Sequence, residues 1–209
     1  YNTAAGRFAM ADGASESAYA ALWAKALTTS YVSGQYGVNI APVIESARKK
    51  WHDGIDWNNM KWFIKNKVMR GSYSTFLGIS FTDDSHYSAI GVGDTCLFHV
   101  NGNDVTSFPI RDQKEFGNTP LLIWSGNPFS GEIKIPKWVY YIEGEVERGD
   151  ILIMATDSYS HWFMKNLDKK PWERMISGSD GEEKFITDLI KERKMKNDDV
   201  TYAVITSGR

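Results

Sequence analysis

The nine residues GDILIMATD, at positions 149–157, combine a predicted strand with a carboxylate at its end. Residues 150–155 are almost continuously apolar and include two isoleucines, which predicts a buried strand. The strand ends in Thr156-Asp157, and a short helix is predicted from Tyr159 to Leu167. An aspartate after a strand is a good helix N-cap, so Asp157 alone does not indicate a functional site.

The same arrangement occurs near the start of the chain. The apolar residues 8–11 predict a strand that runs directly into Asp12-Gly13. An alanine-rich helix is predicted from Ser15 to about Val32, with Ser15 or Ser17 as its N-cap. Asp-Gly is also a common turn dipeptide, so a turn alone would explain this pair.

Two further aspartates stand beside predicted strands. Asp94 lies in a Gly93-Asp94 turn between two strands, and Asp198 precedes the strand predicted at 200–206. Carboxylates at the ends of neighbouring strands can converge, and several ionised carboxylates stay close only if a cation neutralises them. Because oxygen ligands without nearby His or Cys suit hard cations, the set Asp12, Asp94, Asp157 and Asp198 suggests a site for Mg²⁺ or Mn²⁺.

The rest of the chain changes from a helical to a strand pattern after Gly71. Asn101-Gly102 is a strong hairpin signal, and the neighbouring strands indicate an antiparallel meander. Proline and polar residues predict an irregular connection at 109–137. Further helices are predicted at 41–51, 58–69 and 181–194, and further strands at 73–81, 88–92 and 96–100. We expect one domain, residues 1–209, with an α+β fold of helices packed on antiparallel sheets.

Composition excludes several classes of protein. The chain has 209 residues, 42% of them hydrophobic and 24% charged, with a net charge of −2, which argues against general attraction to nucleic acid. Basic residues cluster at 169–170 and 191–196, and we interpret both runs as solvated surface. No apolar run is long enough for a membrane helix, and the N-terminus lacks a signal-peptide pattern. We expect a soluble, cytoplasmic protein that binds neither nucleic acid nor membrane.

Other reactive residue types have simpler interpretations. The single cysteine, Cys96, excludes an internal disulfide and is expected to be a small buried residue in a strand. The four histidines, His52, His86, His99 and His161, show no metal-ligand spacing, although His161 follows Asp157 by four residues. The eight tryptophans are scattered, so we expect them in the core rather than in a stacking platform.

Four motifs in order, ADG (11–13), GDT (93–95), GDILIMATD (149–157) and NDDVT (197–201), resemble those of the metal-dependent protein phosphatases of the 2C type. The resemblance covers nearly the whole chain. It implies a four-layer α-β-β-α sandwich, in which helices flank two antiparallel sheets. The implied reaction is hydrolysis of phosphoserine or phosphothreonine in a protein substrate by a metal-activated water, without a phosphoenzyme.

The resemblance also implies a role for each acidic position. Asp12 would bridge two Mg²⁺ or Mn²⁺ ions, and Gly13 would offer its backbone carbonyl. Asp157 and Asp198 would complete the shell of the first ion, so Asp12, Asp157 and Asp198 would act in catalysis through bound metal. Asp94, with Asp157, would match the site of a weaker third ion.

The sequence departs from the family pattern at the N-terminus. The family places an acidic ligand, and often a phosphate-binding arginine, about twenty residues before the DG pair, whereas only eleven residues precede Asp12. We therefore expect the N-terminal strand region to be incomplete. Ser158 also replaces the glycine that usually follows the third aspartate.

Three hypotheses follow from the sequence. The first is an active Mg²⁺- or Mn²⁺-dependent protein serine/threonine phosphatase, which we favour. The second is a catalytically degenerate phosphatase-like domain that binds a phosphoprotein or other partner without turnover. The third is an α/β interaction domain whose aspartates are only turns and caps. The sequence indicates neither the physiological substrate nor the oligomeric state.

Overall fold

Helices and antiparallel strands alternate along the chain, and contacts between Cα atoms divide it into two units. A computed structural model describes residues 1–34, 36, 39–117, 119–127, 134–178 and 181–206. Unit 1 comprises Tyr1–Gly93 with Pro120–Glu145, and unit 2 comprises Asp94–Thr119 with Val146–Arg209. The predicted α+β class, with antiparallel sheets and helices, is confirmed. The expectation of one domain over 1–209 stays a prediction.

The larger sheet of unit 1 has four antiparallel strands in the order β1-β3-β4-β8. The strands are β1 (Arg7–Met10), β3 (Phe76–Phe81), β4 (His86–Val92) and β8 (Tyr140–Glu145). A separate pair is formed by β2 (Tyr73–Ser74) and β7 (Ile123–Trp124). In the four-stranded sheet, Met10 at the end of β1 lies opposite Leu77, so Asp12 follows directly from this ladder.

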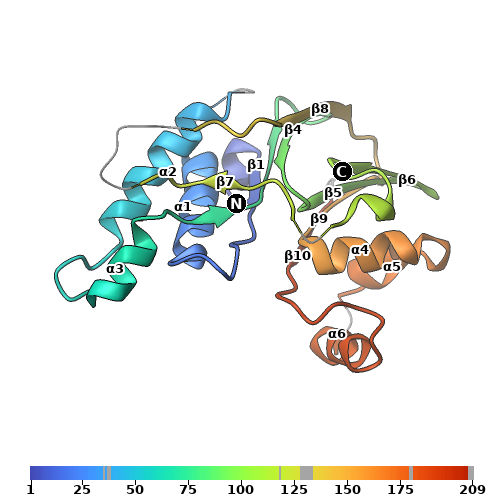
Figure 1. Ribbon diagram of the computed structural model, residues 1–209. Helices are drawn as coiled ribbons and strands as arrows, with labels where there is room; N and C mark the ends of the chain where they lie inside the picture. The colour runs from blue at the N-terminus through green and yellow to red at the C-terminus, as the bar shows by residue number, and fades with distance from the viewer. Residues whose placement is uncertain (35, 37–38, 118, 128–133, 179–180, 207–209) are drawn as a thin grey trace. The chain divides into compact units, whose positions relative to one another are not determined.

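Three helices belong to unit 1: α1 (Ala20–Ser33), α2 (Ala41–Asp53) and α3 (Trp62–Val68). Helices α1 and α2 lie side by side (Figure 1). Their apolar faces pack with β3 and β4 in one core, in which Trp23 and Trp51 meet edge to face with ring centroids 6.2 Å apart. A short 3₁₀ turn, η1 (Thr3–Ala5), precedes β1.

The sheet of unit 2 also has four antiparallel strands, in the order β10-β9-β5-β6. They are β5 (Cys96–Asn101), β6 (Asp104–Phe108), β9 (Ile151–Ala155) and β10 (Tyr202–Thr206). The predicted β5–β6 hairpin is present, but Asn101 pairs with Asp104, so its turn residues are Gly102 and Asn103; Gly102 has a φ of 59°. Because Tyr202 pairs with Ala155, the residues after β9 lie beside those before β10.

Helices α4 (Asp157–Lys165), α5 (Pro171–Ile176) and α6 (Glu182–Lys191) follow β9 and share a core with its sheet (Figure 1). Phe98 of β5 and Phe163 of α4 lie at the centre of this core, with ring centroids 4.3 Å apart. Two 3₁₀ turns, η2 (Gln113–Glu115) and η3 (Leu167–Lys169), complete unit 2. None of the described helices is long and apolar enough to span a membrane.

Several predicted boundaries were wrong for identifiable reasons. Helix α1 begins at Ala20 rather than Ser15, because the Ser17 hydroxyl donates to the Ala14 carbonyl and contacts Ser72 instead of capping the helix. The strand predicted at 73–81 is broken at Thr75, whose hydroxyl accepts a hydrogen bond from the Asp12 amide. Helix α4 begins at Asp157, two residues earlier than predicted. Strand β8 and helix α5 were not predicted.

Candidate functional site

The backbone of Asp12 is fixed by hydrogen bonds to the segment between β2 and β3. Its amide donates to Thr75 Oγ1 at 3.0 Å, and its carbonyl accepts from the Thr75 amide at 2.9 Å and from Ser74 Oγ at 2.7 Å. Asp12 therefore occupies a defined position immediately after β1, on a rigid support.

Gly13 is required by close packing rather than by its backbone angles. A Cβ atom at this position would lie 2.7 Å from the carbonyl carbon and oxygen of Ala20, at the start of α1. Because both are backbone atoms, they cannot move aside as a flexible side chain could. Asp12-Gly13 is thus a tight strand-to-helix connection in which only glycine fits without displacement of α1.

In unit 2, Thr156 connects the end of β9 to the segment before β10. Its hydroxyl accepts from the Thr201 amide at 3.1 Å and lies 3.3 Å from the Asp199 carbonyl oxygen, to which it can donate. Its amide donates to the Thr201 carbonyl at 3.0 Å. The residues next to Thr156 and Asp199 are Asp157 and Asp198, so these bonds hold two predicted site residues on adjacent segments.

Lys196 joins the carboxylates of these two aspartates. Its Nζ lies 3.1 Å from Asp157 Oδ2 and 2.6 Å from Asp198 Oδ2. Because both oxygens contact the same nitrogen atom, Asp157 Oδ2 and Asp198 Oδ2 lie close to each other. Hydrogen bonds to Asp198 and Asp157 raise the pKa of Lys196, and Lys196 in turn lowers the pKa of Asp198. One ammonium thus contacts two carboxylates from separate chain segments and offsets one of their two negative charges.

Asp94 is the buried member of the acidic set, with 6% of its surface exposed. Burial raises the pKa of its carboxyl to about 6, and the charges of Asp157 and Asp198 contribute to the increase. Gly93, the residue before it, has a φ of 94°, a conformation that glycine adopts without strain. The Asp94 carboxyl is therefore both buried and subject to the negative charges of Asp157 and Asp198.

In unit 2, Asp157 and Asp198 contact the same ammonium and their charges act on Asp94, whereas Asp12 and Gly13 belong to unit 1. The membership of Asp12 and Gly13 in one metal site stays a prediction. Sequence reasoning missed Lys196 and the linking role of Thr156. The signal for Lys196 was its position two residues before Asp198, at the end of a basic run interpreted as solvated surface.

The histidines have structural contacts. His99 Nε2 lies 2.8 Å from Oδ2 of the buried Asp150, which connects β5 to the turn before β9. His161 stacks at an angle on Phe116 with ring centroids 5.3 Å apart, and burial together with Lys165 lowers its pKa. Cys96 is fully buried in β5, as predicted.

The acidic set fits a hard cation by its donor chemistry. All three aspartates offer carboxylate oxygens, the ligands that Mg²⁺ and Mn²⁺ prefer, and Lys196 shows that a positive charge is stable between two of them. Within the described part of the chain, no group of three or more His, Cys, Asp and Glu side chains is already arranged to hold a metal. A divalent ion bound to Asp157 Oδ2 and Asp198 Oδ2 would compete with the Lys196 ammonium for these oxygens.

Comparison with known proteins identifies the fold. No protein-family model matches the sequence, and no curated protein does. Among solved structures, PppA, a key regulatory component of T6SS in Pseudomonas aeruginosa, is similar at a TM-score of 0.55 and 14% identity, over 98% of this chain and 87% of that one.

Two serine/threonine phosphatases are similar to the same extent. The catalytic domain of PstP, solved with two manganese ions, has a TM-score of 0.53 at 14% identity over 95% of this chain and 86% of that one. Stp1 from Staphylococcus aureus has a TM-score of 0.58 at 9% identity, over 97% and 84%. The chain therefore has the fold of the bacterial phosphatases of the 2C type.

Proposed function

We propose that the protein is a Mg²⁺- or Mn²⁺-dependent protein serine/threonine phosphatase. The observation that carries the proposal is the contact of Asp157 and Asp198, from separate chain segments, with one ammonium, together with the effect of their charges on the buried Asp94. Turns and helix caps explain each aspartate alone but give no reason for their proximity, which costs electrostatic energy unless a cation is bound. The manganese-bound PstP structure has the same fold and supports this choice of metal.

We assign each residue of the proposed site a role in metal binding or positioning. Asp157 and Asp198 would hold one ion, Asp94 would hold an ion more weakly, and Asp12 with the Gly13 carbonyl would act as further metal ligands. Thr156 would orient the Asp157 and Asp198 segments through its bonds to Asp199 and Thr201. When bound, the ions would supply the charge that activates a water molecule and stabilises the phosphoryl transition state. The substrate class is a protein bearing phosphoserine or phosphothreonine.

A specific observation favours a second candidate, the catalytically degenerate domain that binds a phosphoprotein or partner without turnover. Lys196 already satisfies Asp157 and Asp198, at 3.1 and 2.6 Å, so the pair has a counter-charge without metal. If divalent ions cannot displace the ammonium, the site remains a fixed salt-bridge network. The two candidates therefore differ in metal-dependent turnover.

Hydrolysis of p-nitrophenyl phosphate against Mn²⁺ concentration separates them. We expect saturable, Mn²⁺-dependent turnover, and a decrease of roughly 100-fold or more in kcat/KM for Asp157→Asn, because a metal ligand is lost. Asp104→Asn is the matched control, since Asp104 is an exposed aspartate of β6 in the same unit. Phosphoserine, phosphothreonine and phosphotyrosine peptides would then establish the substrate class.

Two outcomes would contradict the phosphatase proposal. Absence of turnover at saturating Mn²⁺ would favour the degenerate domain, above all if Mn²⁺ also fails to raise the melting temperature. Equal loss of activity in Asp157→Asn and Asp104→Asn would show that the observed turnover does not depend on the acidic set.

A further inference from the structure

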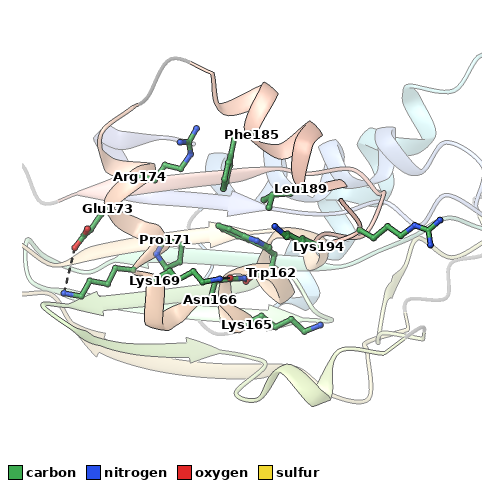
Figure 2. Close-up of a pocket in the computed structure, with 12 residues that line it drawn as sticks. Trp162, Lys165, Asn166, Lys169, Pro171, Glu173, Arg174, Phe185, Leu189 and Lys194 are labelled. Atoms are coloured by element: carbon green, nitrogen blue, oxygen red, sulfur yellow. Dashed lines mark hydrogen bonds and ion pairs between the residues drawn. The ribbon is translucent and has the colours of Figure 1, made fainter. Parts of the chain in front are cut away.

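A cavity of about 700 Å³ lies in unit 2, apart from the acidic set. Its lining comes from α4, from η3 and α5, and from α6 and the residues that follow it. Figure 2 shows Phe185 and Leu189 of α6 pointing toward Trp162 of α4. The volume is within the range of about 300–1,000 Å³ that is typical of ligand sites.

The charge around this cavity is strongly positive. Six basic residues and one acidic residue, Glu173, line it, although the whole chain has a net charge of −2. One quarter of the 24 lysines and arginines of the chain therefore surround one cavity. The six are Lys165, Lys169, Lys170, Arg174, Arg193 and Lys194.

Two basic runs that are distant in sequence meet here. Lys169 ends η3 and Lys170 follows it, whereas Arg193-Lys194 comes after α6. Each run by itself has the composition of a solvated surface. The fold places both on one cavity, where their like charges repel each other unless an anion lies between them. This juxtaposition was not visible in the sequence.

Salt bridges among the described residues neutralise only part of this charge. Arg174 pairs with Glu182 at 2.9 Å and Lys194 with Glu192 at 2.7 Å, and the Lys170–Glu173 contact is long, at 4.0 Å. Lys165 and Arg193 form no salt bridge with any described residue. The cavity therefore retains positive charge that an acidic ligand could neutralise.

The inner wall includes closely packed aromatic side chains. Phe185 packs edge to face on Trp162 with ring centroids 5.5 Å apart, and the Arg174 guanidinium lies over the Phe185 ring, 4.1 Å from its centroid. Because Arg174 is also bound to Glu182, its position is fixed. An apolar wall with a basic rim is complementary to a peptide that carries acidic residues beside a large apolar side chain.

We propose that this cavity binds an acidic segment of a partner protein. An apolar side chain of the segment would pack against Trp162 and Phe185, and its carboxylates would face the basic rim. The basic residues stand on separate segments around the cavity, so they suit a ligand with several spaced anionic groups better than a single phosphate. The proposal does not depend on phosphatase activity.

Fluorescence anisotropy with a labelled twelve-residue peptide, rich in Glu and Asp around one Phe, tests the proposal at 150 mM salt. We expect the acidic peptide to bind at least tenfold more tightly than its Gln/Asn analogue, and Lys165→Glu with Arg193→Glu to weaken binding about tenfold. The control is Lys49→Glu with Lys65→Glu, two exposed lysines of unit 1, which changes the net charge equally.

The four altered positions are exposed, and circular dichroism would verify that both double variants remain folded. If the two double variants weakened peptide binding equally, the loss of affinity would be explained by net charge alone, and the proposal would be overturned. Tighter binding of ATP or a single-stranded oligonucleotide at the same residues would also overturn it, by assigning the cavity to a nucleotide or nucleic acid. Binding of the acidic peptide should persist in Asp157→Asn, so failure of the proposed phosphatase activity is measured separately.

Discussion

At the scale of single residues, the contact with the greatest consequence is the one between the Lys196 ammonium and two aspartates. An isolated ion pair on the surface contributes little, and the Lys196 side chain is 59% exposed. Here, however, the ammonium separates two carboxylates that would otherwise repel each other. A divalent ion at the proposed site and the ammonium would compete for the same oxygens, so Lys196 would weaken metal binding.

Replacement of Lys196 by methionine removes this competition and retains most of the apolar stem. We expect Lys196→Met to lower the Kd for Mn²⁺ roughly fivefold, and to lower the free energy of unfolding without metal by up to about 1 kcal/mol. Isothermal titration calorimetry and urea denaturation measure the two effects. Lys194→Met is the control, because Lys194 pairs with Glu192 instead. A weaker Mn²⁺ affinity in Lys196→Met would show that Lys196 assists metal binding rather than opposing it.

The sequence predicted the acidic residues of the site but not their surroundings. Asp94, Asp157 and Asp198 were recognisable because each stands beside a strand signal that is local in the chain. The contact of Lys196 with Asp157 spans 39 residues and depends on how a flexible side chain crosses from one segment to another. Tertiary placement of this kind has no local signal, so the basic run was assigned to solvent.

At the scale of secondary structure elements, antiparallel pairing positions the candidate site. Strand β10 pairs with β9 so that Tyr202 lies opposite Ala155, and Thr156 then meets Thr201. Asp157 begins α4 immediately after this contact, and Asp198 lies in the segment that leads into β10. The position of one carboxylate relative to the other therefore depends on the register of two strands and on the Thr156 hydroxyl.

Substitution at Thr156 tests this dependence. Thr156→Val retains the shape but leaves the partly buried Thr201 amide without its acceptor, and we expect a loss of about 1–2 kcal/mol in the free energy of unfolding. Thr156→Ser retains the hydroxyl and is expected to lose less than half as much. Urea denaturation measures both, and Mn²⁺ titration should show weaker binding in the valine variant alone. Equal stability of the two variants would indicate that the hydroxyl does not hold the segment.

Elements with strong apolar patterns were predicted, and elements shaped by tertiary contacts were not. Strands β5 and β9 and helix α2 were predicted within about two residues, because the two strands are almost continuously apolar and the helix buries apolar residues at helical spacing. Strand β8 was missed because its six residues, YYIEGE, are exposed or half-buried at the edge of the sheet. The weak apolar periodicity of such an edge strand does not distinguish it from a loop.

At the scale of the whole molecule, the described residues include two hydrophobic clusters that share no residue. One is built around Trp23, Ile44 and Phe76 in unit 1, and the other around Phe98, Ile153 and Phe163 in unit 2. The chain crosses between the units three times, because unit 1 resumes at Pro120 and unit 2 resumes at Val146. The free energy of local unfolding depends on the contacts within each cooperative region. A substitution that weakens packing in one core should therefore increase hydrogen exchange first in the unit that contains that core.

Hydrogen–deuterium exchange of two matched core variants tests this expectation. Ile44 and Ile153 are both fully buried, so Ile44→Val and Ile153→Val should each cost about 1 kcal/mol. We expect Ile44→Val to increase exchange mainly in α1 and α2, and Ile153→Val to increase it mainly in β5, β9 and α4. Ile135→Val is the control, because Ile135 is 46% exposed. The same increase across both units in both variants would show that the two cores open as one cooperative structure, and metal binding in unit 2 would then stabilise the whole chain uniformly.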